Sequence, residues 1–178
     1  TIEIVFSSWL VLSGIYAKSA DLSGQTVTSN AYVVSIENCS HITVRRMLLA
    51  YDNRYQNSGL MLGYQSSTLL WEENEGYYTH RSGFIFAGTN NSIMRRNYVN
   101  SRGYQDIIPG GYPSINTTRG DQDLLVYPGN DNILENNISE GSETAFVAQS
   151  VGTSTADRNQ FLGNIAISAI AGFATAVS

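Results

Sequence analysis

The stretch Ser92-Ile-Met-Arg-Arg-Asn97-Tyr-Val99 occurs again, in altered form, as Asn132-Ile-Leu-Glu-Asn-Asn137-Ile138 and as Asn159-Gln-Phe-Leu-Gly-Asn164-Ile-Ala166. Each copy begins with a small polar residue, has an apolar residue two positions later, and reaches an Asn after three more positions. Internal repeats have to be identified before individual elements, because a repeat determines the whole architecture. This stretch therefore decides the fold.

Two weaker copies lie nearer the N-terminus. They are Leu69-Leu-Trp-Glu-Glu-Asn74 and His41-Ile-Thr-Val-Arg-Arg-Met47-Leu48, the second with Met in place of Asn. A further short apolar segment precedes each copy, at 32–36, 59–62, 83–86, 124–127 and 145–148. The equivalent positions Met47, Asn74, Asn97, Asn137 and Asn164 are 27, 23, 40 and 27 residues apart.

A period of about 25 residues with two or three very short strands is typical of a solenoid. Each strand would pair in parallel with its equivalent in the next coil, with apolar side chains pointing inward. Asn at an inward-facing turn can bond the backbone of that turn and the Asn of the next coil. We therefore expect a structural ladder of Asn74, Asn97, Asn137 and Asn164 in one domain, 1–178, of about six to seven coils.

The pattern resembles the right-handed parallel β-helix superfamily, the pectate-lyase-like solenoids, from about Trp9 to the C-terminus. The resemblance implies an all-β, single-stranded parallel β-helix and concerns architecture rather than activity. The polygalacturonase-like branch has Asn-Thr-Asp and Gly-His-Gly, whereas this chain has Asn116-Thr117-Thr118 and no Gly beside His41 or His80. The Arg-x-Pro-x-x-Arg of the pectate-lyase branch is also absent. A β-sandwich is the alternative fold.

The composition is poor in charge. Charged residues make up 14% of the chain, hydrophobic residues 42%, and the formal net charge is -5. The negative charge argues against nucleic-acid binding, and the apolar content argues against disorder. Cys39 has no partner for a disulfide scaffold, and Lys18 is the single lysine. This composition favours an extracellular or cell-surface protein.

Both ends of the sequence look like strands, at 1–6 and 172–177, and neither has a recognisable capping helix. Solenoids need polar caps to remain soluble. We therefore expect the chain to be part of a longer protein, or its ends to be covered by further domains or by other copies in a homo-oligomer. No apolar stretch is long enough to predict a membrane span.

The 40-residue interval between Asn97 and Asn137 contains an insertion at 104–123. Insertions in solenoids emerge on one face, which is often the binding face. Aromatic rings suited to stacking on a sugar and an Arg suited to an anionic sugar give the carbohydrate-binding candidates. These candidates are Tyr104, Tyr112, Arg119 and Trp71, although Trp71 also fits a core position.

Carboxylates in the same insertion suggest catalysis. Asp121 and Asp123 lie two residues apart, so on a strand they would share one face at a separation of about 7 Å. Inverting glycoside hydrolysis needs two carboxyl groups at about that distance. The catalytic candidates are Asp121, Asp123, Asp106 and Arg119. No cofactor is otherwise expected, but Asp121 and Asp123, or Asp131 with its Asn neighbours, could instead bind calcium.

Charged residues also recur with the repeat. Arg45-Arg46 and Arg95-Arg96 occupy equivalent positions, with Glu72 and Glu135 at the position of Arg95 in other coils. Alternation of charge along one face predicts a solvated ion ladder, with an anionic-glycan patch as the alternative. Aromatic residues gather separately at Tyr51, Tyr55, Tyr64, Trp71, Tyr77 and Tyr78.

Two functions follow from these features. The first is a non-catalytic extracellular β-helix module, structural and carbohydrate-binding, as in a surface fibre, sheath or adhesin. The second is a polysaccharide lyase or glycoside hydrolase whose groove is formed by 104–123. A polysaccharide is the expected ligand in either case.

Overall fold

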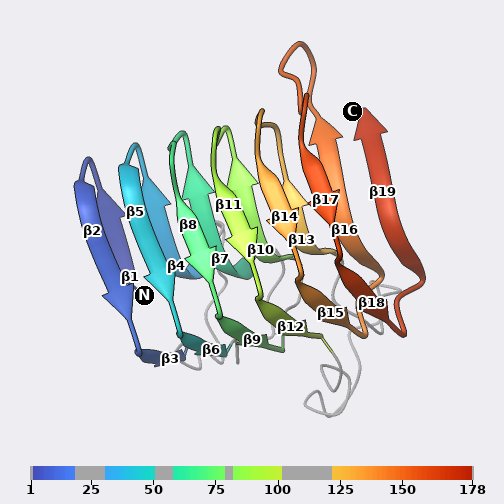
Figure 1. Ribbon diagram of the computed structural model, residues 1–178, viewed down its shortest axis with the longest axis horizontal. Helices are drawn as coiled ribbons and strands as arrows, with labels where there is room; N and C mark the ends of the chain where they lie inside the picture. Colours follow the sequence, from blue (N-terminus) through green and yellow to red (C-terminus); the bar gives the residue numbers. More distant parts are fainter. Residues whose placement is uncertain (1, 19–30, 51–57, 79–81, 102–121, 178) are drawn as a thin grey trace, which may run out of the picture.

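The computed structural model describes residues 2–18, 31–50, 58–78, 82–101 and 122–177. Within these ranges the regular structure is β-strand, without an α-helix. All pairs of neighbouring strands are parallel, and the strands stack along one axis in three sheets (Figure 1). The chain is thus an all-β solenoid of the parallel β-helix kind, as the repeats predict. The antiparallel pairing of a β-sandwich does not occur among these strands.

Sheet A contains seven strands, in the order β1 (Ile2–Val5), β4 (Ala31–Glu37), β7 (Ser58–Tyr64), β10 (Ser82–Ala87), β13 (Gln122–Val126), β16 (Thr144–Ser150) and β19 (Ala171–Val177). Sheet B contains six, β2 (Ser8–Ser13), β5 (Ser40–Arg45), β8 (Leu70–Glu72), β11 (Ile93–Arg95), β14 (Ile133–Glu135) and β17 (Gln160–Leu162). Sheet C also contains six, β3 (Tyr16–Lys18), β6 (Leu48–Ala50), β9 (Glu75–Tyr77), β12 (Tyr98–Asn100), β15 (Ile138–Glu140) and β18 (Ile165–Ile167).

One coil takes a strand from sheet A, then one from sheet B, then one from sheet C. Among the described residues, six such coils have a strand in all three sheets, and β19 adds a seventh strand to sheet A alone. The strands of sheet A are the apolar segments that precede the repeat copies. The strands of sheets B and C lie within the copies, before and after the ladder position. The strands predicted at the two ends of the chain are β1 and β19.

The core lies between the three sheets. Trp71, Phe84, Phe86 and Phe146 are its largest aromatic members and are fully buried. The ring of Trp71 packs on Phe86 with 4.6 Å between ring centroids. Because the coils stack in register, each inner side chain packs on its equivalents in the coils before and after it, so only the end coils lack a neighbour.

Candidate functional site

A sharp corner joins sheet B to sheet C in every coil. The residue just before each ladder position has a left-handed backbone conformation, with φ between 51° and 71°. A left-handed residue between two strands turns the chain abruptly, and only Gly adopts that conformation without steric cost. Four of the six coils nevertheless use other residues here. The corner residues are Gly14, Arg46, Glu73, Arg96, Asn136 and Gly163.

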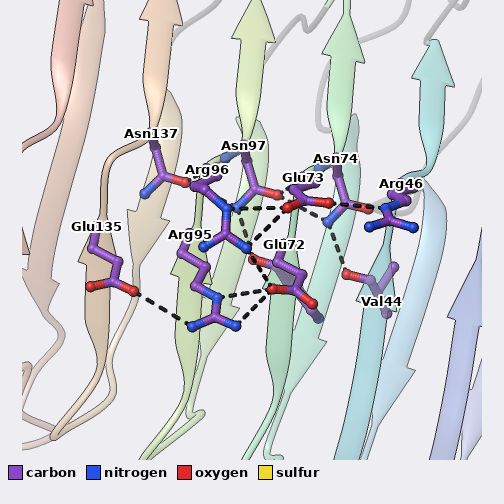
Figure 2. Close-up of polar contacts among 11 residues, drawn as sticks. Val44, Arg46, Glu72, Glu73, Asn74, Arg95, Arg96, Asn97, Glu135 and Asn137 are labelled. Atoms are coloured by element: carbon purple, nitrogen blue, oxygen red, sulfur yellow. Dashed lines mark hydrogen bonds and ion pairs between the residues drawn. The ribbon is translucent and has the colours of Figure 1, made fainter.

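The next residue is buried and forms the predicted ladder in the three coils of Asn74, Asn97 and Asn137 (Figure 2). The backbone N–H groups of Met47, Asn74, Asn97 and Asn137 each donate to Oδ1 of the Asn in the following coil, at 3.1, 3.0, 3.0 and 2.9 Å. Interior Asn side chains also donate Nδ2 to the next Oδ1. Each side-chain Nδ2 further donates to a carbonyl of the preceding coil, as Asn74 does to Val44. The ladder is therefore confirmed, and it ends at Asn164.

A second inner ladder lies five residues earlier in the four coils from Leu69 to Asn159. The backbone N–H of Leu69 donates to Ser92 Oγ at 2.9 Å, that of Ser92 to Asn132 Oδ1 at 3.0 Å, and that of Asn132 to Asn159 Oδ1 at 2.9 Å. These are the small polar residues that open the repeat copies. The repeat pattern identifies these residues but by itself assigns them no hydrogen bonds. Their constant spacing, five residues before the Asn of the first ladder, is the feature that could have predicted a second ladder.

The ion ladder occupies the outside of the same corner (Figure 2). Arg95 donates to Glu72 from Nε at 2.9 Å and lies 2.8 Å from it through Nη2. Arg96 contacts both Glu72 and Glu73 at 3.0 Å. Arg46 donates to Glu73 at 3.0 Å. Arg95 also lies 3.9 Å from Glu135 of the following coil, so the predicted alternation of charge is present across four coils.

Charge pairing changes the titration of the exposed carboxyl in this cluster. The hydrogen bond from Arg46, followed by that from Arg96, lowers the pKa of Glu73 below its ordinary value of 4.5. A hydrogen bond from Arg158 likewise lowers the pKa of Asp131. Both carboxyls are therefore ionised at neutral pH and engaged by guanidinium groups.

Asp123 is the one catalytic candidate within the described residues, and it lies inside the coil. It is fully buried, and its carboxylate accepts hydrogen bonds from Ser101 and, at 2.6 Å, from Ser139. The hydroxyl of Ser139 is in turn 3.1 Å from that of Ser142. A catalytic role would require the Asp123 carboxylate to lie on an exposed face. That requirement is not met, because both Asp123 and the next residue, Leu124, are buried at the start of β13.

The remaining candidates from the insertion, Tyr104, Asp106, Tyr112, Arg119 and Asp121, lie outside the described residues. Trp71 is fully buried, so its ring belongs to the core and offers no face to a sugar.

Tyrosines gather on the outer face of sheet C. Tyr77 and Tyr98 lie edge to face with centroids 5.9 Å apart, and Tyr78 is 6.2 Å from Tyr77. Their hydroxyls donate to carboxylates, Tyr77 to Glu75 at 2.9 Å and Tyr98 to Glu140 at 2.6 Å. Desolvation, followed by the hydrogen bond to Glu75, raises the pKa of Tyr77 to about 12. Tyr51 and Tyr55 of the predicted aromatic cluster lie outside the described residues.

The two ends of the coil stack expose large apolar side chains. Of the fifteen such side chains found among the described residues, seven lie between Val5 and Tyr16, five lie from Leu162 onward, and three lie between. Trp9 at the first end stacks on His41 of the next coil, with centroids 4.0 Å apart. The apolar surface is therefore concentrated at the ends of the axis.

Within the described ranges, no cluster of three or more His, Cys, Asp or Glu side chains could hold a metal ion. Asp131, a candidate calcium ligand, is paired with Arg158 through two 2.6 Å contacts, and its neighbour Asn132 belongs to the second ladder. The same ranges contain no helix with the length and apolar character needed to cross a membrane. No protein-family model, curated protein or solved structure matches the chain.

Proposed function

We propose that this chain is a non-catalytic structural section of an extracellular or cell-surface β-solenoid, with both coil ends covered by further polypeptide. One observation carries the proposal, namely that side chains of the inner rows are exposed at the ends. Leu10 is 37% exposed, whereas Ile42 at the same position one coil further on is fully buried. Phe173 is 55% exposed, whereas Phe146 beneath it is fully buried.

Burial of these side chains provides a driving force for assembly. Apolar surface removed from water contributes about 25 cal/mol per Å², so one large side chain supplies about 1.5–3 kcal/mol. The end strands also present unpaired backbone groups, which template the addition of another strand. Exposed Phe6, Trp9, Ile165, Ile170 and Phe173 make such an addition favourable at both ends.

The composition supports an exterior location. The chain has one lysine and one cysteine, and only 14% of its residues are charged. The burial of Asp123 between serine hydroxyls favours a structural role for the one catalytic candidate that is described. The polysaccharide lyase or hydrolase alternative gains no support from this carboxylate.

Lysine substitutions at the C-terminal end test the proposal. Ile165→Lys combined with Phe173→Lys should reduce the hydrophobic-dye binding of the purified chain. Leu48→Lys is the matched control, because Leu48 is a 39% exposed aliphatic residue on sheet C away from that end. Dye fluorescence measures this binding. A wild-type chain that binds no dye would contradict the proposal.

Carbohydrate binding is a second candidate function, supported by the outer face of sheet C. Tyr77, Tyr78 and Tyr98 supply flat amphipathic rings there, and Asn100 donates to the Tyr98 hydroxyl at 2.8 Å. Aromatic rings beside carboxylate and amide groups are the side chains that bind sugar hydroxyls and apolar sugar faces.

A glycan array tests this second function. Binding by the wild-type chain should be lost in Tyr78→Ala and retained in Tyr64→Ala. Tyr64 is a suitable control because it is a similarly exposed tyrosine, 41% against 39% for Tyr78, and it lies on sheet A. If Tyr64→Ala and Tyr78→Ala reduced glycan binding equally, sheet C would be excluded as the binding face.

A further inference from the structure

Both inner ladders have a direction along the axis. In each rung the side-chain oxygen of one coil accepts from the backbone N–H of the preceding coil. Every coil within a ladder therefore depends on the next coil, toward the C-terminus, to satisfy its own backbone donor. Burial without such an acceptor is costly, because a buried N–H that lacks a partner loses its hydrogen bond to water.

At the N-terminal end the same two rows are apolar. The row that ends in Asn159 begins with Leu10, Ile42 and Leu69. The row that ends in Asn164 begins with Ile15 and Met47. The first coil therefore offers no side-chain oxygen in either row.

At the C-terminal end both rows finish in Asn. The side chains of Asn159 and Asn164 reach back to carbonyls of the preceding coil, Gly129 at 2.8 Å and Leu134 at 2.7 Å. Their oxygens accept from Asn132 and Asn137. Their own backbone N–H groups have no acceptor among the described residues. The end coil thus presents two donors, five residues apart, that face away from the stack.

We infer that the C-terminal end binds a parallel β-coil from outside residues 1–178 that carries side-chain oxygen acceptors at two positions five residues apart. Asn suits the second position, because an Asn there would accept both the backbone N–H and the side-chain amide of Asn164, as Asn164 does for Asn137. Either Ser or Asn suits the first, since Ser92 and Asn132 both serve in that row. The inference rests on the proposed function and specifies the partner of one end.

A second copy of residues 1–178 does not fit this description. Its first coil would place Leu10 and Ile15 over Asn159 and Asn164, leaving both donors without an acceptor. The ends also differ in outline, because sheet A has seven strands and sheets B and C have six. If β1 of a second copy paired with β19, then β17 and β18 would remain one strand short of contact (Figure 1). A partner that satisfies the donors of Asn159 and Asn164 must therefore pair directly with β17 and β18.

An extended chain tests the inference. β19 pairs with β16 in register up to Val177 opposite Ser150, so a copy of residues 151–170 appended after Val177 continues the solenoid. In one version the copy keeps both Asn residues. In the matched control the copies of Asn159 and Asn164 are replaced by Leu and Ile, as in the first coil. Hydrogen exchange of the original Asn159 and Asn164 amides is then measured by NMR.

The Asn version should slow exchange of these two amides by about tenfold or more, and the Leu/Ile version should not. Equal slowing by both versions would overturn the requirement for acceptors while leaving the proposed function intact. Slowing in the unextended chain as its concentration rises would identify a second copy as the occupant and also overturn the inference. Failure of the proposed function has a separate signature, the absence of dye binding by the unextended chain.

A second variant keeps the inference testable if the extension does not fold. Asn159→Leu combined with Asn164→Ile in the unextended chain removes the acceptors for Asn132 and Asn137. Exchange of those two amides should accelerate by about tenfold, and that of Asn74 should not change. Unchanged protection of Asn132 and Asn137 would show that the rungs need no side-chain acceptor and would overturn the inference.

Discussion

Arg96 and Asn97 are neighbours in sequence and belong to two ladders that run side by side along the same corner. The Arg96 side chain is 46% exposed and shares two carboxylates with other arginines, whereas Asn97 is 1% exposed and satisfies two buried backbone groups of the preceding coil. Exposed ion pairs contribute little, because water and salt screen them. Unsatisfied buried groups are expensive. The inner ladder should therefore hold the coils in register, and the outer ladder should add little.

Removal of a central rung should have the largest effect. Asn97→Ala removes the acceptor for the Asn74 backbone and side chain and the donor to the Trp71 carbonyl. We expect a loss of about 2–4 kcal/mol in the free energy of unfolding, measured by urea denaturation. Asn164→Ala, at the open end of the same ladder, should cost about 1 kcal/mol or less. Equal losses in the free energy of unfolding at Asn97 and Asn164 would contradict the larger role expected for a central rung.

Glu72 is the most buried member of the outer ladder and should have an intermediate effect. Its side chain is 11% exposed and accepts from both Arg95 and Arg96. Glu72→Gln should cost about 1–2 kcal/mol by the same urea measurement, because two guanidinium groups lose their shared charge partner. Arg46→Ala is the control, since its side chain is 65% exposed. Arg46→Ala should leave the midpoint unchanged within error, and a larger loss there than for Glu72→Gln would reverse the expected order.

A pH series isolates the exposed pairs at Glu73. Arg46 and Arg96 lower the pKa of Glu73 in the folded chain below 4.5, the ordinary pKa of this carboxyl group. The ionised carboxylate therefore stabilises the folded state at pH values above 4.5. That contribution is lost as the pH falls through the lowered pKa. The wild-type melting temperature should therefore fall slightly more than that of Glu73→Gln between neutral pH and acid. Parallel curves for the two proteins would mean that the pairing does not persist in solution.

The smallest effect concerns a single titration on sheet C. Tyr77 has a pKa of about 12, raised by burial and then by its hydrogen bond to Glu75. The difference in alkaline ultraviolet absorbance between wild type and Tyr77→Phe should therefore titrate near that value. The unfolded chain releases this proton at the ordinary pKa of 10.0. The free energy of unfolding should therefore decrease as the pH rises from 10.0 to about 12. A difference that titrates at the ordinary value would place Tyr77 in open solvent.

Much of the fold could be predicted because it depends on a repeat. The spacing of Asn74, Asn97, Asn137 and Asn164 reports the coil length, and parallel stacking follows from strands too short for hairpins. The ion ladder could be predicted for the same reason, since register carries equivalent residues into contact. Side-chain type then identified the Asn row as the inner one.

The corners and the candidate site could not be predicted in the same way. Arg46, Glu73 and Arg96 adopt a left-handed conformation that their side chains do not favour, and the geometry of the stack imposes it. Asp123 is buried against Ser101 and Ser139, and strand alternation cannot predict that both Asp123 and Leu124 are buried at the start of β13. Trp71 could not be assigned from sequence because aromatic residues serve both cores and binding faces.

Amide hydrogen exchange of the unmodified chain tests the central claim most directly, namely that the inner ladders bind the coils together and are open at the C-terminal end. The backbone amides of Asn74, Asn97 and Asn137, each bonded to a side-chain oxygen of the next coil, should be strongly protected. Those of Asn159 and Asn164 should exchange near the rate of an unstructured peptide. Protection of Asn159 and Asn164 equal to that of Asn97 in a monomeric chain would contradict the account.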